Sequence, residues 1–351
     1  MSRPTLRDVA ARAGVSISTV SYALNDASTL PLAEATKEKV RRAARELGYV
    51  PNGVARSLQA RASRAIGVIL GKPLTLPRYA AVVEGIARGL RSDGFRLSLL
   101  DETDALRGVD DVRAGNLDGL VFIGHDDQGV PDDVRGAIVA HRIPFVAIDC
   151  GPGTGGDRYA TVDFDYATGV RQVMLHLRAA GVETILYVRP GIDSPAEDAR
   201  ALALRDEERA SRVDVHTLTT PVTVETIARF DAGDVDRSHH DDRVGLIAEA
   251  LADLDDLGAR PERTAILCAW GIDAEAAYRA ASAHDPRVRV AALAAGSLSA
   301  RLWPGLTYSR LPLAEGGREA ARLIVAVARA DGAAPDAPER VSLAPTLDAS
   351  H

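Results

Sequence analysis

The stretch "TLRDVAARAGVSISTVSYALN", residues 5–25, contains two short helical patterns separated by a glycine. In the first, Thr5 followed three residues later by Asp8 resembles a capping box, and apolar side chains recur at helical spacing up to Gly14. In the second, Ser16 is placed to cap a helix that runs to about Leu24. Two helices joined by a short turn that contains glycine are typical of a helix-turn-helix.

The second helix has an unusual polar face. Apolar residues at helical spacing anchor one side of it, and small hydroxyl side chains cover the other. In a helix-turn-helix the second helix enters the major groove of DNA with its N-terminal residues toward the base edges. We expect base contacts from Ile17, Ser18 and Tyr22, and phosphate contacts from Thr19, Ser21 and Asn25. The alternative is an ordinary amphipathic helix with a solvated face.

The charge is distributed unevenly along the chain. The whole chain of 351 residues carries a net charge of −7. Residues 1–64 nevertheless hold 11 Lys and Arg against 5 Asp and Glu, so the acidic excess lies in the remainder. A basic N-terminal segment on an acidic body is what a phosphate-binding head on a soluble regulatory domain would show.

Composition excludes several classes of protein. No apolar run is long enough for a membrane span and no signal-peptide pattern opens the chain, so we expect a cytoplasmic protein. Cys150 and Cys268 each lie in an apolar run, which favours buried reduced thiols over a disulfide or a metal site. We expect no metal and no cofactor.

The hydrophobic pattern predicts three segments. A third helix from about Leu32 to Leu47, ended by Gly48, completes a head over residues 1–48. Residues 49–65 contain a Pro-Asn-Gly break, a short helix around residues 54–59 and a basic linker. Residues 66–351 alternate apolar strands with amphipathic helices, which indicates parallel sheets in two similar lobes. The strands that we expect are "IGVIL", "FRLSLLD", "DGLVFIG", "PFVAID", "TILYVR", "TAILCA" and "VRVAALA", and residues 151–156 and 231–243 are expected to be exposed loops.

Three consecutive segments, "TLRDVAARAGVSISTVSYALN", "KEKVRRAARELGYVPNGVARSL" and "IGVIL", resemble the lactose-repressor (LacI/GalR) family of bacterial transcription regulators. The resemblance implies a helix-turn-helix head, a hinge helix and a periplasmic-binding-protein-like body of two doubly wound α/β lobes. It also implies a homodimer, or a tetramer, in which paired hinge helices wedge a leucine into the minor groove. The implied DNA contacts are Thr5, Ser16, Ile17, Ser18, Thr19, Ser21, Tyr22, Asn25, Asn52, Ala55, Arg56 and Leu58.

Two features of the head depart from the family. Tyr22 stands where relatives often carry Arg or another strong base-reading residue, so a bidentate contact to guanine is not available from it. The stretch "DASTLPLAEA", residues 26–35, is about two residues longer than is common in the family. For Leu58 the alternative to a minor-groove wedge is simple helix packing within the linker.

The resemblance further implies a small-molecule effector site between the lobes, at the carboxyl ends of the strands. An Arg with carboxylates suits a polyhydroxylated or anionic molecule. Trp270 and Gly271, however, replace the Asn-Asp pair that is usual in the family, and Asp273 is the nearest carboxylate that could substitute for it. For each of these positions a surface salt bridge or a helix cap is the alternative. The implied effector residues are Arg78, Tyr79, Asp149, Asp165, Arg200, Trp270 and Asp273.

We therefore expect a sequence-specific transcription regulator, a repressor of a palindromic operator, with affinity set by a small molecule. A regulator of the same fold without an effector stays open as the alternative. A dehydrogenase-like α/β enzyme with a DNA-binding head is disfavoured because no phosphate-binding glycine loop, nucleophile elbow or H-E-x-x-H motif is present. The run "HHDD" at 239–242 lacks placed partners for a metal and is expected to be a solvated loop.

Overall fold

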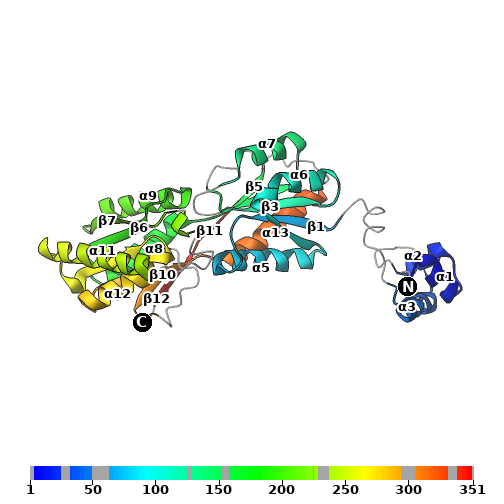
Figure 1. Cartoon of the computed structure of the whole chain (residues 1–351), viewed down its shortest axis with the longest axis horizontal. Helices are drawn as coiled ribbons and strands as arrows, with labels where there is room; N and C mark the ends of the chain where they lie inside the picture. The colour runs from blue at the N-terminus through cyan, green and yellow to red at the C-terminus, as the bar shows by residue number, and fades with distance from the viewer. Residues whose placement is uncertain are drawn as a thin grey trace. The chain divides into compact units, whose positions relative to one another are not determined.

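A computed structural model describes residues 4–24, 32–49, 63–124, 129–151, 158–223, 225–227, 237–293, 303, 305–330 and 338–349. The chain divides into two compact units, Met1–Ser63 and Arg64–His351 (Figure 1). We call the first unit the head and the second the body. Among the described residues, no helix combines the length and the apolar character that crossing a membrane requires.

The head contains three helices: α1 (Leu6–Ala13), α2 (Ile17–Ala23) and α3 (Glu34–Leu47). The predicted capping box is confirmed, because the Thr5 backbone N–H donates to the Asp8 carboxylate at 2.8 Å and the Asp8 N–H donates to the Thr5 hydroxyl at 3.4 Å. Gly14 ends α1 in the left-handed region, as predicted, with φ 59°. The three helices pack around Val9, Val20 and Val40, each with no exposed surface.

The body contains two six-stranded sheets, and each is the centre of one lobe. The first sheet has the order β11-β5-β4-β3-β1-β2, and all its neighbours are parallel. Its strands are β1 (Ala65–Leu70), β2 (Arg96–Asp101), β3 (Gly119–Ile123), β4 (Phe145–Ile148), β5 (Ala160–Phe164) and β11 (Arg340–Leu343). We call this half, with its helices, the N-lobe. Its helices are α5 (Pro77–Ser92), α6 (Ala105–Arg113), α7 (Asp132–His141) and α13 (Leu313–Arg329), with η1 (Glu102–Asp104).

The second sheet, the centre of the C-lobe, has the order β12-β10-β9-β8-β6-β7. It is parallel except that β12 runs antiparallel to β10. Its strands are β6 (Thr184–Pro190), β7 (Asp214–Thr220), β8 (Thr264–Cys268), β9 (Arg289–Ala292), β10 (Leu306–Arg310) and β12 (Thr346–Ala349). Its helices are α8 (Tyr166–Ala179), α9 (Pro195–Ala210), α11 (Arg237–Asp256) and α12 (Ala274–His284), with η2 (Pro261–Arg263) and η3 (Gly271–Asp273).

Helices cover both faces of each sheet, which explains why the central strands are apolar on both sides. In β1, Ile66, Val68 and Leu70 face α5 and α13, whereas Ala65 and Ile69 face α6 and α7. In the C-lobe, α8 and α9 cover one face and α11 and α12 the other (Figure 1). The predicted fold class of two doubly wound lobes is confirmed.

Two helices of the N-lobe, α5 and α13, pack unusually closely. A methyl group at Gly85 would overlap the backbone carbonyl of Ala314, and one at Gly317 would overlap the carbonyl of Val82. The glycines therefore allow the two helix backbones to touch. Because α13 directly follows the C-lobe strand β10 in sequence, this contact brings the returning chain back onto the N-lobe.

All seven strands predicted from the sequence are present, and the predicted loop at 231–243 is wrong from Arg237 on, its earlier part lying outside the described residues. Residues 231–243 were expected to form an exposed loop, but α11 begins at Arg237. The "HHDD" run at 239–242 therefore lies in the first turns of this helix. Polar residues at these positions suggested a loop, yet the Arg243 side chain is almost fully buried and makes tertiary contacts that stabilise the helical start.

Candidate functional site

The outward face of α2 is the first candidate site. Ile17 and Tyr22 are each 44% exposed, and Ser18 beside them is also exposed. The opposite face contains Val20 and Ala23, which are buried in the head core. The three residues predicted to contact base edges are therefore all accessible on a helix that the core holds in place.

Two of the predicted DNA contacts also cap helices. Thr5 caps α1, and the Ser16 hydroxyl accepts the backbone N–H of Thr19 at 3.0 Å and lies 2.8 Å from the Thr19 hydroxyl. Both caps lie at the surface, where a hydroxyl can donate its O–H to a phosphate oxygen. In this structure the Thr5 hydroxyl donates instead to Asp8 Oδ2 at 2.7 Å. Ser21 is half-buried on the flank of α2. Their roles toward DNA stay predictions.

The hinge cannot be compared with the structure. Five of the predicted DNA contacts lie outside the described residues, so the minor-groove wedge stays a prediction. These residues are Asn25, Asn52, Ala55, Arg56 and Leu58.

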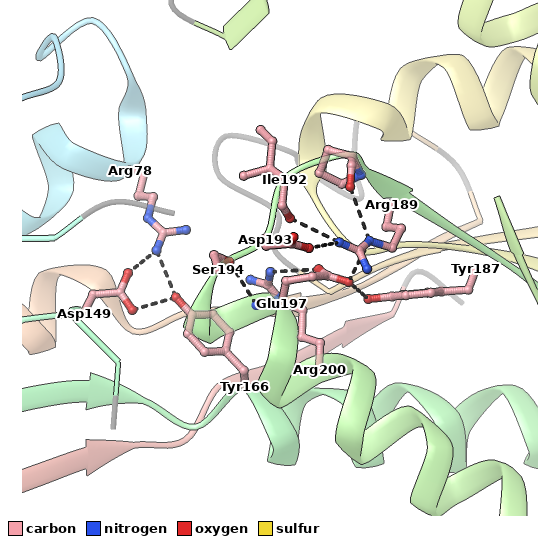
Figure 2. A network of polar contacts seen from close by, with 11 residues as sticks. Arg78, Asp149, Tyr166, Tyr187, Arg189, Ile192, Asp193, Ser194, Glu197 and Arg200 are labelled. Atoms are coloured by element: carbon pink, nitrogen blue, oxygen red, sulfur yellow. Dashed lines mark hydrogen bonds and ion pairs between the residues drawn. The ribbon is translucent and has the colours of Figure 1, made fainter. Parts of the chain in front are cut away.

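The second candidate site begins in the N-lobe, where three side chains form a hydrogen-bonded group (Figure 2). Arg78 in the first turn of α5 forms an ion pair with Asp149, which follows β4. The Tyr166 hydroxyl, from the first residue of α8, donates to Asp149 Oδ1 at 2.7 Å and accepts from Arg78 Nη2 at 2.9 Å. Asp149 has φ 55°, a conformation that costs energy for a residue with a side chain. The structure thus joins two predicted effector residues through a tyrosine that the sequence reasoning missed.

Arg200, in α9 of the C-lobe, approaches the same tyrosine from the other side. Its guanidinium lies over the Tyr166 ring, 4.4 Å from the centroid, and only 1% of the side chain is exposed. Within the described part of the chain, none of its three side-chain nitrogens has a hydrogen-bond partner. A buried guanidinium with unsatisfied donors costs free energy unless a further group supplies acceptors.

Glu197 provides the charge balance for Arg200. It lies one helical turn before Arg200, with Glu197 Oε2 3.8 Å from Arg200 Nη1, and is 1% exposed. Its other oxygen accepts the Tyr187 hydroxyl at 2.8 Å and lies 3.5 Å from Arg189 Nε. Burial, followed by the nearby Glu197 carboxylate, raises the pKa of Tyr187, so this hydroxyl remains a donor. Figure 2 shows these groups gathered around the start of α9, whose cap is Ser194.

Two other predicted effector residues have structural roles. Tyr79 is 4% exposed and packs in the core beneath the first sheet. Asp165 caps α8 by accepting the Thr168 N–H at 2.8 Å, which was the alternative considered from the sequence. Burial acts to raise the pKa of Asp165, but the two hydrogen bonds from Thr168 outweigh it and lower the pKa.

Trp270 and Asp273 lie at the carboxyl end of β8. Asp273 is fully buried and pairs with Arg243 Nη1 at 3.0 Å, and the same nitrogen donates to the Ile272 carbonyl at 2.9 Å. Desolvation raises the pKa of Asp273, although Arg243 and the Thr220 hydroxyl act in the opposite direction. Trp270 is 6% exposed, and its indole N–H has no hydrogen-bond partner among the described residues. Arg243 thus engages Asp273 Oδ1, whereas Asp273 Oδ2 has no hydrogen-bond partner among the described residues.

The described residues contain no group of three or more His, Cys, Asp or Glu side chains placed to hold a metal ion. Cys150 and Cys268 are free and buried, as predicted, and burial raises the pKa of both thiols.

Comparison with known proteins decides the family. Residues 5–52 match the model of the bacterial regulatory proteins of the lacI family, and residues 174–349 match a periplasmic binding protein-like domain. The chain belongs to the lacI family. Its members are DNA-binding transcription regulators, and this chain is one of them.

Relatives along the chain agree with this family. The transcriptional regulator CelR of Thermobifida fusca is 28% identical over 92% of this chain and 91% of its own length. The repressor PurR of Serratia proteamaculans (strain 568) is 35% identical over 47% of this chain and 48% of its own. A lac repressor dimer bound to operator and the anti-inducer ONPF has the same fold, with a TM-score of 0.73 at 22% identity over 99% of this chain and 98% of that one.

Several residues of the site carried no signal in the sequence. Tyr166 and Tyr187 lie in strand and helix patterns that indicate core packing, and Arg243 lies in a segment that was expected to be a loop. Glu197 at three residues before Arg200 is the exception, because that spacing places both side chains on one helix face. A search for oppositely charged pairs at helical spacing in α9 would have found it.

Proposed function

We propose that this regulator is a homodimeric repressor that binds a palindromic operator in the cytoplasm. The observation that supports DNA reading is the exposed face of α2, held by a separate compact head. One head reads only a few base pairs, so two copies are needed for a specific site. Paired hinge helices with Leu58 in the minor groove would bend the operator between the half-sites.

We also propose that a small molecule bound beside Arg200 changes operator affinity. The observation that carries this proposal is a fully buried guanidinium at the carboxyl end of the second sheet, whose three nitrogens have no hydrogen-bond partner in the part of the chain that the structure describes. Tyr166 covers one face of the guanidinium, so its donors remain directed in the plane of the group. Hydroxyl, carboxylate or phosphate oxygens of a ligand fit such donors. Because CelR has been solved as a cellobiose complex, cellobiose is the first probe.

A regulator without an effector is the second candidate function. It is favoured by the internal pairing of the other polar groups, since Asp149 is engaged by Arg78 and Tyr166, and Asp273 by Arg243. In such a protein, Tyr166 would hold the two lobes in a fixed relation without a ligand.

One set of experiments tests both proposals. The full chain is used to select an operator from random duplex DNA, and its mass is measured by sedimentation with and without that operator. A palindromic motif and a dimer are expected, whereas a monomer that binds single half-sites equally well would contradict the proposal that the protein binds DNA as a dimer. Operator titrations then include cellobiose, other disaccharides, sugar phosphates and small dicarboxylates. A shift in affinity that disappears in Arg200→Met supports the effector site, and no shift with any probe supports the second candidate.

The hinge has its own test. Leu58→Ala removes an apolar wedge but no charge, so operator bending and affinity should fall while the salt dependence of binding stays nearly constant. Normal bending and unchanged affinity would show that Leu58 is a packing residue.

A further inference from the structure

The described head has two exposed large apolar side chains, and both lie on α2. Ile17 and Tyr22 are each 44% exposed, while the other large apolar residues of the three helices pack into the head core. With 44% of its surface exposed, Ile17 is only partly used by the head core. It lies at the first position of α2, next to the exposed Ser18, on the face that the core leaves open.

The chemistry of α2 limits what it can read. Its sequence, ISTVSYA, contains no charged side chain and no amide. Bidentate contacts to guanine need Arg or Lys, and those to adenine need Asn or Gln, so neither is available from residues 17–23. What an isoleucine can recognise in the major groove is a methyl group, because the C5-methyl of thymine is the one apolar feature that base pairs present there. Cytosine methylated at C5 presents the same group in the same groove.

We propose that Ile17 reads the C5-methyl group of a pyrimidine in each operator half-site. The inference rests on the proposed function, in which α2 is the base-reading helix. Specificity at this position then comes from apolar contact and the exclusion of water, not from a charged hydrogen bond. Tyr22, five residues further along, is the other exposed large side chain of α2.

The size of the effect follows from one methyl group. Burying a single methyl-sized group changes an equilibrium about fourfold, so losing it in both half-sites of a palindrome should weaken binding about fifteenfold. Salt dependence should not change, because no phosphate contact is involved.

The test begins with the operator selected by the full chain. Each thymine is replaced by deoxyuridine, symmetrically in both half-sites, and the dissociation constant is measured at one salt concentration. We expect one symmetric position at which deoxyuridine weakens binding about fifteenfold. In Ile17→Ala, thymine and deoxyuridine at that position should bind within about twofold of each other. Arg42→Gln is the matched control, since Arg42 is an exposed residue of α3, and it should retain the full discrimination.

A second arm distinguishes the source of the methyl group. At the same position the T·A pair is replaced by C·G, with and without a methyl group at C5 of cytosine. If methylated cytosine restores the affinity measured with thymine, Ile17 recognises the methyl group on either pyrimidine. If only thymine gives that affinity, Ile17 recognises the methyl group of thymine alone. Both results support recognition of a methyl group.

Two results would overturn the inference. One is an operator in which deoxyuridine is tolerated within twofold at every thymine, and the other is an unchanged deoxyuridine penalty in Ile17→Ala. Failure to select any operator is a different result, because it overturns the proposed function together with this inference.

Discussion

The two lobes share one strand order but differ in how the buried charged side chains are paired. In the N-lobe, the carboxylate of Asp149 is hydrogen-bonded to Tyr166 and paired with Arg78, so the group satisfies itself. In the C-lobe, Arg243 pairs with Asp273 Oδ1, but Asp273 Oδ2 and the three side-chain nitrogens of Arg200 have no hydrogen-bond partner among the described residues. Lobes of the same architecture thus differ in whether the described residues leave buried polar side-chain atoms without hydrogen-bond partners.

The lobes also differ in how their last strand joins. β11 adds to the first sheet in parallel, whereas β12 adds to the second sheet antiparallel.

The lobes differ in helix packing as well. In the N-lobe, helix α13 contacts α5 through glycines, whereas in the C-lobe a methyl group at Gly245 of α11 would meet nothing within 4 Å. The N-lobe is therefore sensitive to helix packing, and the C-lobe to its buried charges.

The largest expected effect is in the C-lobe pair. Arg243→Leu leaves Asp273 buried without its cation and should lower the free energy of unfolding by about 3–5 kcal/mol at pH 8, measured by urea denaturation. Because burial already raises the folded-state pKa of Asp273, its ionised form is the costly one. The penalty should therefore grow as pH rises from the unfolded pKa through the folded one, and be smaller at pH 5 than at pH 8. Arg88→Leu, which breaks an exposed pair with Glu84, should cost less than about 1 kcal/mol.

Helix packing in the N-lobe gives the next effect. Gly85→Ala forces α5 away from the Ala314 carbonyl and should destabilise the body by about 1–3 kcal/mol. Gly245→Ala in α11 is the matched C-lobe variant and should be stabilising by about 0.5–1 kcal/mol, because alanine is the better helix former and nothing obstructs it. Equal stability changes in the two variants would show that the close contact between α5 and α13 has no energetic role.

A smaller effect is expected where the lobes meet. Tyr166→Phe keeps the ring over Arg200 but removes the hydroxyl between Arg78 and Asp149, which should cost about 1–2 kcal/mol in thermal or urea unfolding. Tyr166→Leu also removes the cation–π contact and should cost about 0.5–1 kcal/mol more than the phenylalanine variant. If both variants were as stable as the wild type, this group would contribute nothing to holding the lobes.

The smallest change in stability is expected for Arg200→Met. Glu197 loses this cation but keeps the Tyr187 hydroxyl at 2.8 Å and Arg189 Nε at 3.5 Å, so it is not left without a partner. Replacing a guanidinium that lacks hydrogen bonds by an apolar side chain of similar length should therefore alter the unfolding free energy by less than about 1 kcal/mol. A decrease in the unfolding free energy of several kcal/mol, as for Arg243→Leu, would show that Arg200 makes stabilising interactions within the chain and does not need a ligand to satisfy it.

Local pattern was enough for the head and for the buried strands. Thr5 with Asp8, the turn at Gly14 and the Ser16 cap are interactions within three or four residues, so their spacing in the sequence is their spacing in the structure. Most of the central strands were predicted because burial on both faces makes them continuously apolar. Five strands were missed. The edge strands β7, β11 and β12 are polar and partly exposed, and the inner strands β5 and β10 contain polar residues that interrupt the apolar pattern.

Only the tertiary structure decided which polar residues already have hydrogen-bond partners and which could still bind another group. The sequence placed Arg78, Asp149, Arg200 and Asp273 near strand ends, and strand ends of parallel sheets converge on one edge. It did not show that Arg78 and Asp149 share the Tyr166 hydroxyl or that Arg243 occupies Asp273, because these partners are 17 to 88 residues apart. Whether a buried charge is satisfied depends on side chains that meet across the fold, so the sequence determined the fold and the family, and tertiary contacts determined which donors remain for a ligand.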